Sequence, residues 1–99
     1  MKVIIENKKI IQCIENKKHI FSNNIVKKLS IIIAKLEASV DIYDIWNNKS
    51  YNFKKIQGYD NRYSIRINDY YRLEMTIKWL NNEQTVGNIY LEEISNHYN

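Results

Sequence analysis

The sequence predicts a small α+β domain in which helices come first and an antiparallel sheet follows. Three observations carry this expectation. Apolar residues repeat with a helical period over residues 24–39, and two runs within 62–79 alternate between apolar and polar side chains. The chain has no proline and only two glycines, so nothing marks a linker. Because 99 residues hold one modest core, we expect residues 1–99 to form a single domain.

The first half of the chain predicts one strand and several helical segments. Residues 2–6 suit a short strand, and 10–21 fits one short helix with a polar exit. The clearest helix covers 24–39 and has cap residues available at 22–24. Its apolar positions recur every three or four residues: Ile25, Leu29, Ile32, Ile33, Leu36 and Val40. A short helical turn over 41–47 should bury Ile45 and Trp46.

The second half of the chain predicts three strands. In the first run, Tyr63, Ile65 and Ile67 alternate with polar residues, and five apolar residues between positions 71 and 79 alternate in the second. Gly58 precedes both runs and should open the sheet. A last strand over about 85–94 should have a bulge at Gly87. Successive strands would then form an antiparallel meander.

The register of the central hairpin follows from burying one face of both strands. Directly opposed residues on an antiparallel pair share a face, so the apolar rows match when Ile67 lies opposite Tyr71 and residues 68–70 form the turn. That register places Arg66 directly opposite Arg72 on the other face, where like charges destabilise each other. All three arginines, Arg62 included, fall within residues 62–72, although lysine outnumbers arginine twelve to three.

Two interpretations of this arginine pair remain open. A guanidinium directs two donors onto one phosphate or carboxylate, which an ammonium cannot copy, so Arg66 and Arg72 can share an anion. Alternatively, Glu74 lies on the same face and forms a salt ladder with one of the two arginines. Two arginines against one glutamate leave a positive charge over, which favours the anion site.

The composition indicates an anionic partner and a reducing compartment. The net charge of +4 favours binding to nucleic acid. Cys13 is alone, so a disulfide is excluded within the chain and a cytoplasmic location is expected. The apolar runs are too short for a signal peptide or a membrane span, so we expect no membrane partner. No cluster of His, Cys and Asp has metal-ligand spacing, so neither a metal nor a cofactor is expected.

Four segments of the sequence form a recognisable set: Ile-Gln-Gly at 56–58, Arg-Tyr-Ser-Ile-Arg-Ile-Asn at 62–68, Tyr-Arg-Leu-Glu at 71–74, and Leu-Glu-Glu-Ile-Ser-Asn-His-Tyr at 91–98. Together with the helix at 24–39 and residues 41–46, they resemble the host-inhibition-of-growth (HigB-type) toxins of the RelE/ParE toxin–antitoxin superfamily. The resemblance covers nearly the whole chain. It implies a RelE-like α+β fold with two N-terminal helices packed on one antiparallel sheet.

The resemblance also implies an activity and its partners. HigB-type toxins are ribonucleases that cut messenger RNA on the ribosome without a metal or cofactor, and a HigA-like antitoxin protein encoded beside them neutralises them. The expected partners are therefore mRNA, the ribosome and an antitoxin. The expected catalytic residues are Lys54, Arg66, Arg72, His97 and Tyr98. We expect the neighbouring Lys55, Arg62 and Asn96 to bind RNA.

The chemistry assigns these residues roles. Cutting RNA without a metal requires a base for the 2′-hydroxyl proton, an acid for the leaving 5′-oxygen, and cations for the phosphate. Histidine titrates near neutrality, so His97 is the expected proton carrier. Tyr98 can stack on a base or donate a proton, and Lys54 or Lys55 can neutralise charge or act as the acid. Arg66 and Arg72 would clamp the scissile phosphate.

The chain departs from the family's pattern in two places. It has Gln57 where many members have a basic residue, and it ends in Asn-His-Tyr at 96–98 where many end in Asp-Tyr-His, so the division of acid and base roles stays open. Two other functions also remain. One is a non-catalytic module that binds RNA or a partner protein through the arginine pair. The other is a gyrase-directed toxin of the same superfamily, against which the His/Tyr ending argues.

Overall fold

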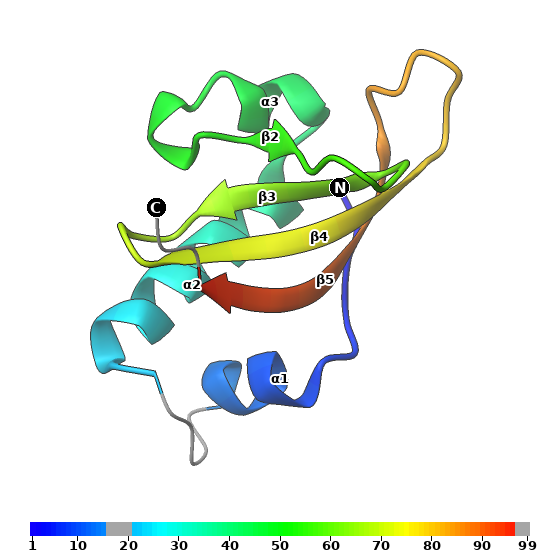
Figure 1. Cartoon of the computed structure of the whole chain (residues 1–99). Helices are drawn as coiled ribbons and strands as arrows, with labels where there is room; N and C mark the ends of the chain where they lie inside the picture. The colour runs from blue at the N-terminus through cyan, green and yellow to red at the C-terminus, as the bar shows by residue number, and fades with distance from the viewer. Residues whose placement is uncertain (16–20, 97–99) are drawn as a thin grey trace.

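The computed structural model describes residues 1–15 and 21–96, which form a five-stranded sheet with the two longer helices on one face (Figure 1). The α+β class is confirmed. In chain order the elements are β1 (Val3–Ile5), α1 (Lys8–Ile14), α2 (Asn23–Ala38), α3 (Ile42–Trp46), the 3₁₀ turn η1 (Lys49–Tyr51), β2 (Lys54–Lys55), β3 (Arg62–Arg66), β4 (Tyr71–Trp79) and β5 (Gly87–Asn96).

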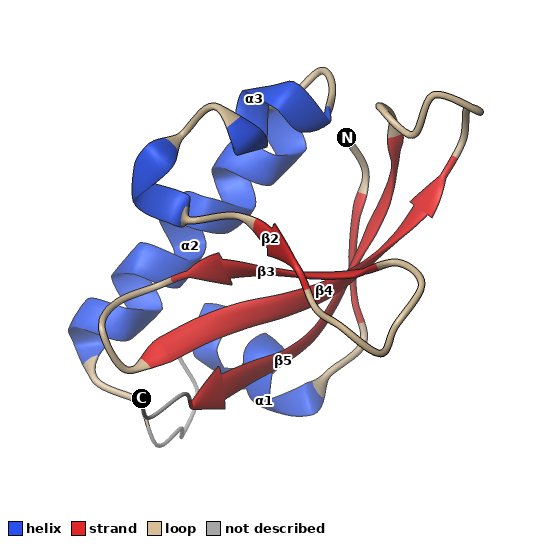
Figure 2. Ribbon diagram, turned by 45° about the horizontal axis from the view of Figure 1, so that its top comes forward, coloured by secondary structure: helices blue, strands red, loops and turns tan. Residues whose placement is uncertain are grey.

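The strand order across the sheet is β1-β5-β4-β3-β2 (Figure 2). The strands from β2 to β5 pair antiparallel, but β1 runs parallel to β5. The expectation of one antiparallel sheet is therefore wrong at this edge. A parallel neighbour needs a long crossover connection, and the chain between β1 and β5 provides one. The described residues also form three helices, so the expected arrangement with two N-terminal helices is incomplete.

The helices begin where the sequence offers caps. The side chains of Asn7, Ser22 and Asp41 accept hydrogen bonds from backbone amides in the first turns of α1, α2 and α3. The predicted apolar stripe of α2 is buried from Ile25 to Leu36. Val40 is the exception: its side chain is 78% exposed because α2 ends at Ala38, before the next turn could carry it inward.

The central hairpin has the predicted register. Tyr63 pairs with Met75, Ile65 with Leu73, and Arg66 with Arg72. The amide of Ile67 donates to the carbonyl of Tyr71 at 2.9 Å, which leaves residues 68–70 as the turn. Burial of Ile65, Leu73 and Met75 on the helix side specifies this register, because a one-residue slip would expose all three.

Two expectations about glycine are corrected. The sheet begins before Gly58, because β2 already pairs with β3 at Lys54. Gly87 lies in register opposite Trp79 and is not a bulge. It is glycine because a Cβ there would lie 2.7 Å from the carbonyl oxygen of Lys78. The register shift falls further along β5, where the pairing passes from Met75–Leu91 directly to Glu74–Glu93 and leaves Glu92 as the extra residue.

The core fills the space between the sheet and the helices. Fully buried side chains come from both layers: Ile10, Cys13, Leu36, Ile65, Leu73, Met75, Ile77 and Ile89. Burial raises the pKa of the Cys13 thiol. In α3, Ile42 and Ile45 are buried as part of this core, but Trp46 is half-exposed and contacts the ring of Phe53 edge-on. None of the helices in the described ranges is long and apolar enough to cross a membrane.

Candidate functional site

The face of the sheet opposite the helices, here called the open face, carries alternate residues of β3, β4 and β5. Antiparallel pairing arranges them in three rows. One row contains Arg66, Arg72 and Ser95. The next contains Ser64, Glu74 and Glu93. The third contains Arg62, Thr76 and Tyr90. Two rows with arginine therefore flank a row with two carboxylates.

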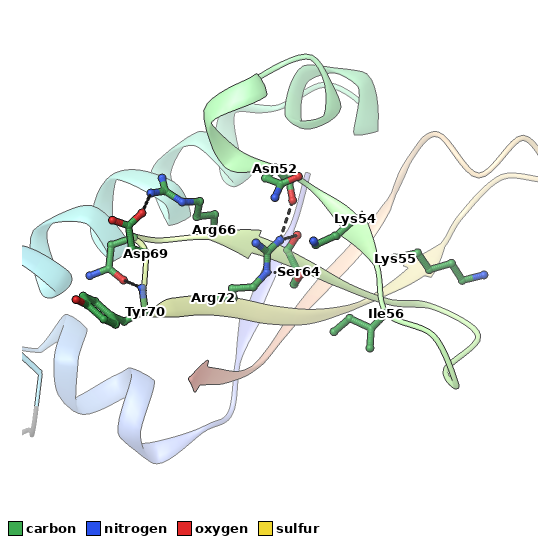
Figure 3. Close-up of a pocket in the computed structure, with 10 residues that line it drawn as sticks. Asn52, Lys54, Lys55, Ile56, Ser64, Arg66, Asp69, Tyr70 and Arg72 are labelled. Atoms are coloured by element: carbon green, nitrogen blue, oxygen red, sulfur yellow. Dashed lines mark hydrogen bonds and ion pairs between the residues drawn. The ribbon is translucent and has the colours of Figure 1, made fainter. Parts of the chain in front are cut away.

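A pocket of about 430 Å³ lies over the Arg66–Arg72 row (Figure 3). We call it the arginine pocket. Its wall is built from the end of the hairpin, from β2 and from the residue that follows η1: Asn52, Lys54, Lys55, Ile56, Ser64, Arg66, Asn68, Asp69, Tyr70 and Arg72. The pocket therefore joins segments that are twenty residues apart in the sequence.

Arg72 lies at the centre of this pocket and is held by neutral oxygens. Its Nε donates to Ser64 Oγ at 2.9 Å, and its Nη2 donates to the carbonyl of Asn52 at 2.7 Å. The carbonyl of Ser64 is a longer acceptor for Nη2, at 3.4 Å. These bonds fix the plane of the guanidinium without neutralising its charge.

The electrostatic surroundings of Arg72 disfavour its charge. Partial burial and repulsion by Arg66 lower the pKa of Arg72, and attraction by Glu74 only partly offsets them. The group remains a cation at neutral pH, because a guanidinium does not lose its proton in this range. An anion placed against Arg72 would relieve the repulsion from Arg66.

Asn52 supplies its carbonyl through an unusual backbone conformation. Its φ of 43° and ψ of 50° lie in the left-handed region, which asparagine tolerates better than most residues. This turn ends η1 and leads into β2. The local backbone thus presents the carbonyl to Arg72 and starts the strand that carries Lys54.

Arg66 shares the face of Arg72, but its guanidinium is turned toward the hairpin loop, where it forms an ion pair with Asp69 (Figure 3). Both side chains are exposed, so this pair contributes little to stability. Asp69 therefore holds the Arg66 guanidinium toward the hairpin loop and accepts a hydrogen bond from its Nη2.

The two lysines of β2 differ in direction. Lys54 pairs with Ser64, and its side chain points toward Ser64 and Arg72 (Figure 3). Lys55 pairs with Tyr63, and its side chain points away from the centre of the pocket. Tyr70 lies on the hairpin side of the pocket and is exposed. The site therefore combines three cations near one another with an exposed aromatic ring on its rim.

Arg62 lies outside the arginine pocket, among carboxylates. Its Nε donates to Glu74 at 2.9 Å and its Nη2 to Glu93 at 3.1 Å, while Nη1 lies 3.6 Å from Glu92. Its guanidinium also covers the ring of Tyr59 at 4.9 Å. Burial alone would lower the pKa of Arg62, but Glu74, Glu93 and Glu92 together raise it. We call these four charged residues the Arg62 cluster.

The expected salt ladder is therefore corrected. Glu74 makes its ion pair with Arg62, and Arg66 pairs with Asp69. The sequence argument missed Asp69, Ser64 and Asn52 as partners of the arginine pair. The hairpin register contained a signal for two of them, because Asp69 follows Arg66 by three residues in the turn and Ser64 lies diagonal to Arg72. No local pattern pointed to the carbonyl of Asn52.

The C-terminal candidates fall into two groups. Asn96 pairs with Tyr71, so it lies on the helix side of the sheet at the end of β5, and Ser95 is the residue opposite Arg72. Asn96 is exposed and does not line the arginine pocket. His97 and Tyr98 lie outside the described residues.

The described part of the site can bind an anion. Arg72 is preorganised, Lys54 lies beside it, and Arg66 becomes available when Asp69 releases it. Within residues 1–15 and 21–96, no three His, Cys, Asp or Glu residues are placed to hold a metal ion. No family model matches the chain, and no curated protein matches it.

Proposed function

We propose that this chain is the toxin of a type II toxin–antitoxin system and acts as a metal-independent endoribonuclease that cuts mRNA on the ribosome. Arg72 carries the proposal: it is a cation fixed by neutral acceptors, beside Arg66 and Lys54, in an open pocket. Such a group suits a phosphate that gains charge in a transition state. The resemblance of the sequence to the HigB-type toxins of the RelE/ParE superfamily supplies the substrate class and the antitoxin partner.

The proposed roles follow the positions of the side chains. Arg72 binds the scissile phosphate, and Arg66 joins it once the Asp69 carboxylate is displaced. Lys54 neutralises charge on the same phosphate or protonates the leaving oxygen. His97 and Tyr98 complete the proton transfers, and the flanking Lys55 contacts the RNA backbone.

A second candidate function is a non-catalytic clamp of the same fold, which binds RNA or a partner protein. One observation favours it: the described residues by themselves form an anion site, in which Ser64 and Asn52 fix Arg72 beside Lys54. The catalytic proposal therefore depends on the residues after Asn96, whereas a clamp needs only the pocket.

Expression of the chain in a bacterial host, with and without the adjacent reading frame, tests the proposal. We expect growth arrest and mRNA cleavage from the chain alone, and neither when the adjacent frame is co-expressed. Primer extension on abundant transcripts would map the cuts. Absence of both growth arrest and cleavage would contradict the proposal.

A chain truncated after Asn96 separates the two candidates. The endoribonuclease loses cleavage but keeps binding of a single-stranded RNA oligonucleotide, because the arginine pocket is intact. A clamp keeps its whole activity. Circular dichroism of both chains provides the control for folding. Cleavage at the parental rate by the truncated chain would rule out the roles of His97 and Tyr98.

A further inference from the structure

Glu74, in the middle row of the open face, lies between two arginines. This residue has Arg72 two positions away on the same strand and Arg62 diagonally across on β3. Long side chains reach such neighbours on one face of a sheet. The carboxylate of Glu74 can therefore be drawn to either end, and the end it takes decides how much positive charge Arg72 presents to the pocket.

Arg62 takes the carboxylate. The Nε of Arg62 lies 2.9 Å from Glu74 Oε1, and the two side chains are only 17% and 10% exposed. Arg72 meanwhile donates to the neutral oxygens of Ser64 and Asn52. The ion pair between Arg62 and Glu74 thus lies at the end of the face that does not line the arginine pocket.

The opposite pKa shifts agree with this geometry. Burial lowers the pKa of both arginines, but the three glutamates raise that of Arg62 above its ordinary value. For Arg72, repulsion by Arg66 adds to burial, and Glu74 raises the pKa too little to compensate. Negative charge on the open face is therefore concentrated at Arg62.

The bulge in β5 brings a further carboxylate to Arg62. Because Glu92 is an extra residue, both Glu92 and Glu93 reach the same guanidinium, and Glu93 lies directly opposite Glu74. Like charges in that position repel each other. Without Arg62, the repulsion from Glu93 would push the Glu74 carboxylate toward Arg72, a cation two positions away on the same strand.

We propose that Arg62 is a positioning residue, which holds the Glu74 carboxylate at one end of the open face and so keeps the Arg72 guanidinium open to an anion. The inference rests on the proposed function, because the anion in question is the phosphate of RNA. It assigns Arg62 an indirect role in place of the direct RNA contact expected from the sequence.

The test uses the full chain and two readouts. The first is the nuclear magnetic resonance signal of the Arg72 Nε–H group, which reports its acceptor without any ligand. The second is the affinity for a fluorescein-labelled single-stranded RNA oligonucleotide at low salt. Arg62→Gln should move the Arg72 signal and weaken RNA binding by up to about fivefold, the effect of a single charge pair at a partly exposed site.

Removal of the competing carboxylate should reverse the effect. Adding Glu74→Gln to Arg62→Gln should return the RNA affinity to within about twofold of the parental value. Glu92→Gln in the same background is the matched control, since it removes the same charge from a residue that lies farther from Arg72 in the sheet. Equal rescue by Glu92→Gln, or no rescue by Glu74→Gln, would overturn the proposal.

Arg62→Gln could unfold, because three carboxylates would lose their cation. The single substitution Glu74→Gln tests the proposal in that case. Glu74→Gln alone leaves Arg62 in place and removes the competitor, so RNA affinity should be parental or tighter. A loss of affinity in that variant would overturn the inference. Failure of the proposed function looks different: the Arg72 signal and the RNA affinities would follow the expected order, while the parental chain would cleave no mRNA.

Discussion

The two ends of the open face place the same residue type in opposite surroundings. At one end, Arg62 contacts the carboxylates of Glu74, Glu92 and Glu93 at 2.9 to 3.6 Å. At the other end, Arg72 donates to two neutral oxygens and lies opposite a second arginine. One guanidinium therefore closes a charge cluster, and the other keeps its charge available to the pocket.

The difference shows that a residue's place in the rows of a sheet decides its role. Both arginines alternate outward from a buried strand, and both are partly buried themselves. Both arginines border the acidic row, but Arg62 also covers the ring of Tyr59, whereas Arg72 shares its row with Arg66. Charge placement on neighbouring strands, and not the residue type, separates a cation held among carboxylates from one that faces a pocket.

Replacing each arginine by lysine should give the largest difference between Arg72 and Arg62. Arg72→Lys keeps the charge but loses the planar pair of donors. Loss of one oriented donor at a developing oxyanion costs about 10² to 10³ in rate, or about 3 to 4 kcal/mol. We expect mRNA cleavage to fall by that factor. Thermal stability should fall only slightly, because the lysine keeps the charge and loses two hydrogen bonds on a partly exposed face.

Arg62→Lys is the partner experiment. Lysine still neutralises the glutamates, so cleavage should fall by no more than about fivefold. Equal losses from the two substitutions would mean that the ends do not differ in role. If Arg72→Lys unfolds, its arginine is structural and the binding role is wrong.

The buried face beneath both ends offers a second test, of intermediate size. Ile65→Val removes one methylene from a fully buried position on β3 and should cost about 0.5 to 1.5 kcal/mol in the free energy of unfolding. RNA affinity of the folded protein should not change, because the open face is untouched. Urea denaturation with the same slope in both proteins would measure the loss.

Ile31→Val provides the exposed counterpart. Ile31 lies on α2 and is 52% exposed, so the same change should stay within about 0.5 kcal/mol. A loss at Ile31 that equals the loss at Ile65 would show that the outer side of α2 is covered in the folded protein.

Release of Arg66 from Asp69 should strengthen anion binding in the arginine pocket. Asp69→Asn removes the carboxylate that pairs with Arg66 at the rim of the pocket. Because the pair is exposed, the gain in affinity for an RNA oligonucleotide should be at most about fivefold, or about 1 kcal/mol. Fluorescence anisotropy at fixed salt would measure it.

Asp60→Asn gives the control for net charge. Asp60 is also exposed but does not line the arginine pocket. A similar gain from both variants would attribute the effect to the overall charge of the protein. A weaker affinity in Asp69→Asn would show that Asp69 orients Arg66 for the ligand.

The smallest expected effect is on the unfolding free energy at alkaline pH, and it depends on Tyr63 on the buried face of the sheet. Burial raises the pKa of the Tyr63 phenol in the folded protein. The neutral phenol therefore stabilises the fold below the pKa of the unfolded state, about 10, and this contribution is lost as pH rises through the higher folded pKa. The unfolding free energy should fall above about pH 10, and Tyr63→Phe should make the fall shallower.

Tyr70→Phe is the matched control, because Tyr70 is exposed and folding buries little of its ring. Burial also raises the pKa of Tyr51, so part of the alkaline fall should remain in Tyr63→Phe. A pH profile identical to that of the parental protein would show that the Tyr63 phenol ionises as readily in the folded state as in the unfolded one.

The hairpin and the main helix could be predicted because each depends on a short-range pattern. Alternation at Tyr63, Ile65 and Ile67 allows one register with the next strand, and that register brings Arg66 opposite Arg72. The stripe from Ile25 to Leu36 needs only the period of the helix. The predicted candidates Lys54, Lys55, Arg66 and Arg72 come together in one pocket because β2 pairs with β3 beside the hairpin.

Other features depend on contacts between distant segments, for which the sequence carries no local signal. The parallel edge formed by β1 requires that the chain return to β1 after three helices and three other strands of its described part. The bulge at Glu92, and not at Gly87, places two consecutive glutamates at Arg62. Asn52 reaches Arg72 from twenty residues away through a left-handed backbone turn.

By itself, the sequence determined the α+β class, the hairpin register and the pairing of two arginines on one face, because burial of alternate residues together with a three-residue turn leaves one arrangement. Only the tertiary structure decided which arginine carries its charge into a pocket. That choice depends on carboxylates and carbonyls from β4, β5 and the turn after η1. Their distances to the guanidiniums are set when the strands pair, since electrostatic interactions depend on separation in space and not on order along the chain.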